Sequence, residues 1–124
     1  MPPPPKLDGP GVQKMKTIEE AQTQVARLHG LVELYALSLK QNKPTGLFGM
    51  TIKRAMIPLV TLLKPQFGLI SDQIAALILS TSRGGSETVK IRMLREGVAS
   101  IKQQFDIAIV RIKENHMVKV EEEA

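Results

Sequence analysis

The segment STSRGGSETVK, from Ser80 to Lys90, holds the residue types that come nearest to a site for chemistry. Two glycines beside a serine and an arginine, just before an expected helix, could bind a phosphate through free backbone amides. A P-loop, however, needs a lysine after its second glycine and a strand before it, and this segment has neither. Glu87 in the first helical turn would also repel an anion. We therefore interpret the segment as a turn between two helices.

No other combination of residues predicts a reaction or a cofactor. The sequence contains no cysteine, which excludes disulfides, thiolate metal sites and cysteine nucleophiles. The two histidines, His29 and His116, stand at no metal-ligand spacing with a carboxylate, so no metal is expected. No serine lies in a GxSxG turn. We expect a protein that is not an enzyme and that binds no cofactor.

Basic residues are the next candidates for binding, because the formal net charge is +5. The excess lies in residues 44–70, which contain no acid, and in residues 86–119. A patch that contacts phosphates would consist of Lys53, Arg54, Arg92, Arg95 and Lys102. The chain has no tryptophan, one tyrosine and three phenylalanines, so base stacking is not expected. Accessory nucleic-acid binding through the phosphate backbone is therefore the second hypothesis for function.

Two long helices are expected to position these residues. The sequence TIEE at Thr17 resembles a capping box, which predicts a first helix over residues 17–42. Ser86 is the expected N-cap of a last helix over residues 86–117. Each helix has an apolar seam at alternating steps of three and four. The seams are Ile18, Ala21, Val25, Leu28, Val32, Tyr35 and Leu39 in the first, and Ile91, Leu94, Val98, Ile101, Phe105, Ala108 and Ile112 in the last.

Two shorter helices are expected between the long ones. The first begins near Thr45, which could cap it, and runs to about Lys64, with a kink or break just before Pro58. The next begins at Ser71 as N-cap and ends at SRGG, where Gly84 suits a left-handed closing residue. The sequence therefore predicts an all-α fold, an antiparallel four-helix bundle with two long heptad helices and two shorter, proline-interrupted helices.

The ends of the chain differ in composition from the bundle domain, expected over residues 17–117. Residues 1–16 are rich in proline and glycine and predict a flexible tail. Four consecutive prolines could dock on an SH3 or WW groove, but a solubilising tail is the preferred interpretation. Residues 118–124 form an acidic tail. With no secretory signal and no apolar run of about 18 residues, we expect a soluble intracellular protein, cytoplasmic or nuclear.

Apolar residues that lie off the two seams are the candidates for binding a partner. They need cover either from another helix of the bundle or from a partner, and both interpretations stay open. These residues are Met93, Ile107 and Val110 on the last helix, and Leu34 and Leu37 on the first.

The leading hypothesis is an adaptor or scaffold domain that binds another protein, with basic flanks that favour an acidic partner. Homo-oligomerisation through the same helices is a variant of it. A membrane surface is not the expected partner, because Pro58 would interrupt an amphipathic surface helix.

Overall fold

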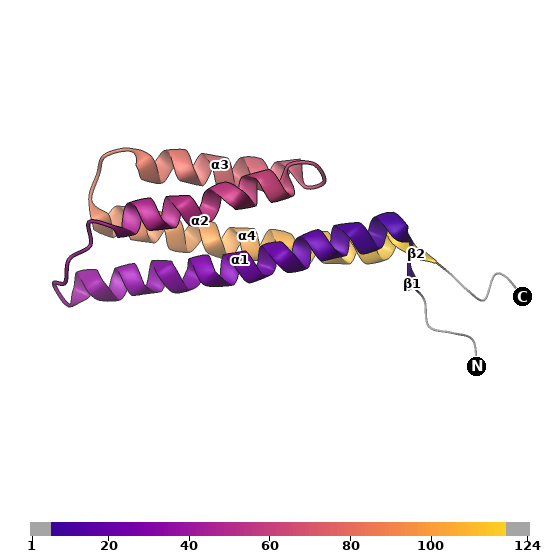
Figure 1. Cartoon of the computed structure of the whole chain (residues 1–124), viewed down its shortest axis with the longest axis horizontal. Helices are drawn as coiled ribbons and strands as arrows, with labels where there is room; N and C mark the ends of the chain where they lie inside the picture. The colour runs from indigo at the N-terminus through magenta and orange to yellow at the C-terminus, as the bar shows by residue number, and fades with distance from the viewer. Residues whose placement is uncertain (1–5, 119–124) are drawn as a thin grey trace, which may run out of the picture.

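The computed structural model describes residues 6–118, which form four helices packed against one another (Figure 1). The helices are α1 (Gly9–Lys40), α2 (Phe48–Leu63), α3 (Gly68–Ser82) and α4 (Glu87–His116). α1 packs against α2 and α4, and α3 packs against the same two helices. The prediction of a helical bundle built from four helices is confirmed.

The four helices share one apolar core. Its members on the long helices are Ile18, Ala21, Val25, Leu28, Val32 and Tyr35 of α1, and Ile91, Leu94, Val98, Ile101, Phe105 and Ile112 of α4. α2 and α3 contribute Ile52, Met56, Leu59, Leu63, Ile70 and Ile74. Burying each large aliphatic side chain stabilises the fold by roughly 1.5–3 kcal/mol before the loss of conformational entropy is counted.

α1 begins at Gly9, not at Thr17 as the sequence analysis predicts. Its N-cap is Asp8, whose carboxylate accepts a hydrogen bond of 2.7 Å from the Gly11 amide. Pro10 in the first turn suits a helix start because the amide that proline lacks would have no partner there. The capping box is therefore wrong, and residues 9–16 are helical rather than part of a flexible tail. Residues 1–5 and 119–124, with most of the acidic tail, lie outside the described residues.

Two short strands join the start of α1 to the end of α4, and the sequence analysis did not predict them. β1 (Lys6–Leu7) pairs antiparallel with β2 (Met117–Val118). Next to this pair, the Asp8 amide donates to the His116 carbonyl at 2.9 Å. The first and last residues of the described chain therefore lie side by side.

The two short helices differ in detail from their prediction. α2 continues past Pro58, which is exposed, and the expected break is absent. No side chain caps α2, and the Thr45 hydroxyl donates to the Glu87 carboxylate instead. α3 begins at Gly68, so Ser71 is not its N-cap. Ser71 lies buried inside the helix and its hydroxyl donates to the Val60 carbonyl at 2.8 Å.

The segment between α3 and α4 is a turn, as predicted. Ser86 caps α4 by accepting a hydrogen bond of 3.2 Å from the Val89 amide. Gly85, and not Gly84, has the positive φ, at 151°. A residue with a side chain is strained in that conformation, so glycine is required one position later than predicted.

α1 and α4 are much longer than the two helices between them. At 1.5 Å per residue, their 32 and 30 residues give lengths of about 48 and 45 Å. The hairpin of α2 and α3 covers only part of this length, and both long helices extend beyond the turn that connects α2 to α3 (Figure 1). This difference in length creates the candidate site.

Candidate functional site

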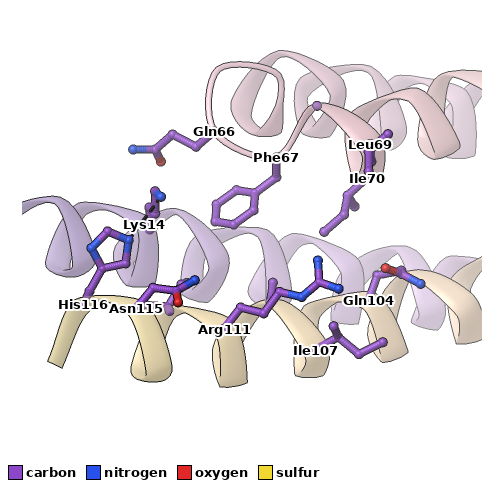
Figure 2. A pocket seen from close by; sticks show the side chains of 13 residues that line it. Lys14, Gln66, Phe67, Leu69, Ile70, Gln104, Ile107, Arg111, Asn115 and His116 are labelled. Carbon is purple, nitrogen blue, oxygen red and sulfur yellow. Dashed lines mark hydrogen bonds between the residues drawn. The ribbon is translucent and has the colours of Figure 1, made fainter.

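A notch opens where the α2–α3 hairpin ends beside the longer helices (Figure 2). Its volume is about 300 Å³. Side chains from α1, from the turn between α2 and α3, and from α3 and α4 line it. The residues that define the notch are Lys14, Phe67, Ile70, Ile107, Arg111 and His116.

Phe67 is held in place by hydrogen bonds on both sides of the turn. Its amide donates to the Leu63 carbonyl at the end of α2, and its carbonyl accepts from the Ser71 amide in α3. The neighbouring Gln66 side chain accepts a hydrogen bond of 3.0 Å from Thr17 of α1. The turn is thereby attached to three helices, and Figure 2 shows the Phe67 ring pointing from it towards the long helices.

The α4 side of the notch is formed by Ile107 and Arg111, which lie one helical turn apart on the same face. The Ile107 side chain is 38% exposed although its neighbours in the core, Phe105 and Ile112, are almost fully buried. The core residues fix the rotation of α4 about its axis. That rotation presents an aliphatic side chain and a guanidinium group to the notch.

His116 closes one end of the notch through contacts with α1. Its Nδ1 lies 3.0 Å from an Asp8 carboxylate oxygen, and its Nε2 lies 3.2 Å from the Lys14 ammonium nitrogen. Since an ammonium group only donates, Nε2 accepts from Lys14 while Nδ1 donates to Asp8. The Gly11 amide, and to a smaller extent His116, holds the pKa of Asp8 below its usual range.

A second polar cluster lies at the other end of the bundle, around Tyr35. The Tyr35 hydroxyl donates to the Glu87 carboxylate at 3.1 Å, and Thr45 donates to the same carboxylate. Burial of the phenol, together with the nearby negative charge of Glu87, raises the pKa of Tyr35 to about 12. This cluster joins α1, the loop after it and the start of α4, and Tyr35 also lines a cavity there.

The five predicted partner-binding residues do not form one surface. Leu34 and Leu37 are half exposed on α1, beside Glu33, which bonds to Arg95 of α4. Since Arg95 precedes Ile107 by twelve residues in α4, the two groups are about 18 Å apart along the bundle.

The three candidates on α4 also have different surroundings. Met93 is half-buried, one turn before Gly97, where α4 meets Leu77 of α3. Val110 is 54% exposed and does not line the notch. Only Ile107 does.

The five residues of the predicted basic patch are divided between two parts of the molecule. Arg92, Arg95 and Lys102 lie along the groove between α4 and α1. Lys53 lines a separate cavity together with Tyr35, and Arg54 is exposed on α2.

Two of these cations also contact polar side chains of α1. Arg95 forms two hydrogen bonds of 2.8 and 2.9 Å to Glu33, which lowers the pKa of that carboxyl. Lys102 lies 2.6 Å from Nδ1 of the exposed His29.

Sequence reasoning missed most of the notch, namely Lys14, Phe67, Arg111 and His116 as binding residues. A signal for Phe67 was present, because an aromatic residue within a proline- and glycine-containing turn needs cover from elsewhere in the fold. For Lys14 the signal was Asp8 followed by Pro10, which suit a helix start, but the prolines and glycines of residues 1–16 also predict a tail.

Comparison of the chain with protein-family models, with curated proteins and with solved structures gave no match. Within residues 6–118, no three histidine or acidic side chains are grouped as metal ligands. None of the helices described is long and apolar enough to cross a membrane. The proposal for function therefore rests on the geometry and charge of the notch.

Proposed function

We propose that this chain is a non-enzymatic protein–protein interaction domain, an adaptor or scaffold, which binds its partner in the notch. The observation that carries the proposal is the exposure of Ile107 opposite the Phe67 turn, in a cavity with basic residues at its edge. Apolar contacts at the centre with charges at the rim are the usual anatomy of a protein interface.

We further propose that the four helices form an antiparallel bundle, which keeps the notch rigid. Two contacts support this arrangement. Asp8 near the start of α1 bonds to His116 at the end of α4, whereas Glu33 late in α1 bonds to Arg95 early in α4. A rigid notch favours binding because little conformational entropy is lost when the partner docks.

The first prediction concerns Ile107→Glu. A buried carboxylate opposite an apolar partner group should weaken binding at least about tenfold, as loss of a central interface residue does. The measurement is capture of partners from cell lysate by the tagged protein after nuclease treatment. The matched control is Leu79→Glu, which places the same charge on an exposed leucine of α3 outside the notch.

A second variant separates a loss of binding from a loss of the fold, which Ile107→Glu alone could cause. Leu69 lines the notch and is 85% exposed, so Leu69→Glu should preserve the helical circular dichroism signal and also abolish capture. A protein partner held by the wild type and by Leu79→Glu, but by neither notch variant, supports the proposal. Equal capture by all four proteins would contradict it.

The same experiment tests binding to nucleic acid. Nucleic-acid binding predicts that the captured material is lost after nuclease treatment and is also lost when Arg92→Glu and Arg95→Glu are combined. In that case the groove between α1 and α4, and not the notch, would be the functional surface. Phosphate contacts would show a steep dependence of binding on salt, whereas an apolar interface would show a weak one.

A further inference from the structure

The notch is chemically different at its two ends (Figure 2). Leu69 and Ile70 on α3 and Ile107 on α4 lie towards one end, whereas Lys14 and His116 lie at the other. Arg111 lies between the two groups. A ligand that satisfies both ends must itself be apolar at one end and anionic at the other.

The positive charges of the notch, Lys14 and Arg111, have no carboxylate at ion-pair distance within the described chain, although Lys14 lies near enough to Asp8 to lower the pKa of that carboxyl. Within residues 6–118, Arg95 forms an ion pair with Glu33 and His116 hydrogen-bonds to Asp8, and neither Lys14 nor Arg111 forms an ion pair. None of the residues that line the notch within this part of the chain is acidic. Asp8 approaches His116 from its Nδ1 side and also accepts from the Gly11 amide, so its charge is already shared.

The dimensions of the notch suit a short helix. The lining residues of α4 extend from Gln104 to His116, which is about 18 Å at 1.5 Å per residue. A volume of about 300 Å³ is at the lower end of the range for small-molecule sites, so the notch accepts side chains rather than enclosing a whole ligand. Because α1 and α4 extend past the hairpin, a docked helix there would continue the layer formed by α2 and α3.

We propose that the notch binds one amphipathic helical segment of a partner protein, with its apolar residues against Phe67 and Ile107 and its acidic residues against Lys14 and Arg111. This inference rests on the proposed function and specifies its partner. Charge complementarity favours such a segment over a second copy of this chain, because two copies meeting at their notches would oppose like charges.

The test uses two synthetic peptides of about four helical turns. The first carries leucines at positions i, i+3, i+4 and i+7 and glutamates in the next two turns. The second has lysines in place of the glutamates. Each is titrated into isotope-labelled full-length protein while backbone amide chemical shifts are recorded. We expect the acidic peptide to shift amides around residues 66–70 and 104–116, and the basic peptide to bind at least about tenfold more weakly.

Charge reversal in the protein identifies the contacts. Lys14→Glu and Arg111→Glu should each weaken binding of the acidic peptide about tenfold and strengthen binding of the basic one. Arg54→Glu makes the same change in net charge on an exposed residue of α2 and should leave both affinities unchanged. Because the two notch variants lie on different helices, a folding defect in one does not prevent the test.

Several results would overturn the inference. They are equal binding of the two peptides, shifts outside the notch, and no shifts at millimolar peptide. Tighter peptide binding after Glu121, Glu122 and Glu123 are all changed to Gln would assign the notch to the chain's own acidic segment. If sedimentation shows that the protein self-associates and that the peptide dissociates the complex, the notch would be assigned to a second copy of the chain. If the peptides fail while capture still depends on Ile107, only the partner chemistry is wrong and the proposed function stands.

Discussion

Tyr35 is the only tyrosine in the chain, and the fold buries it within a polar cluster. Its ring stacks on Phe48 with centroids 5.2 Å apart, and its hydroxyl donates to Glu87. Deprotonation would place a buried phenolate beside a carboxylate, which raises the pKa from 10.0 to about 12. The protonated form of this side chain is therefore part of the folded structure.

The second prediction follows from this shift. Between pH 10 and 12 the folded state retains a proton that the unfolded state has lost, so the free energy of unfolding falls as pH rises through this window. Below pH 10 the contribution of Tyr35 to stability is fully present. Since the chain has no tryptophan, phenolate absorbance reports this one residue, and its midpoint should lie near 12.

Two variants serve as controls for the Tyr35 prediction. Glu87→Gln should lower the phenolate midpoint but leave it above 10, because burial is the larger cause of the shift. Tyr35→Phe should remove this part of the alkaline loss of stability. A midpoint at the value of free tyrosine in the folded wild type would contradict the prediction.

Single residues also show how far the sequence predicts the candidate site. Ile107 was identified because it lies off the apolar seam of its helix, which is a local property. Phe67 joins the notch only because the α2–α3 hairpin ends beside α4, and that position depends on how the helices pack. Lys14 lies in a segment whose prolines and glycines predict a tail, although Asp8 and Pro10 in the same segment start a helix.

Gly97 determines how closely α3 and α4 approach. A Cβ atom at this position would lie 2.6 Å from Cδ2 of Leu77, which is closer than non-bonded carbons allow. One turn later, Gln73 of α3 donates to Ser100 of α4 at 2.6 Å. Gly30 in α1 is different, because within residues 6–118 no side chain and no other segment lies within 4 Å of the position its Cβ would take.

The third prediction compares alanine at these two helical glycines. Gly30→Ala should raise the free energy of unfolding by about 1 kcal/mol, since alanine is the better helix former. Gly97→Ala gains the same preference but overpacks the contact with Leu77, at a cost of roughly 1–3 kcal/mol. We therefore expect no net gain, or a loss, for Gly97→Ala in chemical denaturation.

The Leu77→Ala background separates packing from helix preference. With Leu77 shortened, Gly97→Ala should stabilise the protein about as much as Gly30→Ala does. Stabilisation of the wild type by Gly97→Ala, equal to that by Gly30→Ala, would show that Leu77 moves aside without cost.

The four helices were predictable, but several of their ends were not. Apolar residues recur at helical spacing over long stretches, whereas each cap depends on a few residues that can serve other partners. Ser71 fits an N-cap by type, yet its hydroxyl is used by the Val60 carbonyl across the hairpin. Pro58 predicts a kink or break in the second helix, but the helix continues past it, and Leu59 and Leu63 beyond it are fully buried and stabilise the continued helix.

In the molecule as a whole, different contacts connect α1 to α4 at the two ends of the bundle. At one end the Glu87 cluster connects α1, the loop after it and α4. At the other end, beyond the hairpin, α1 and α4 are connected by Asp8, His116 and the two short strands. The notch lies between this second connection and the hairpin, so both of its walls are fixed by contacts that do not involve a ligand.

The pairing of Lys6 with Val118 has a consequence for the connectivity of the chain. Because these residues are neighbours in space, a short glycine–serine linker could join them, and new termini could be opened between Gly84 and Gly85 in the exposed turn. We expect this circular permutant to have the helical circular dichroism signal of the parent and the same phenolate midpoint for Tyr35. A permutant that fails to fold would mean that the original order of the helices along the chain, and not only their packed arrangement, is needed to assemble the bundle.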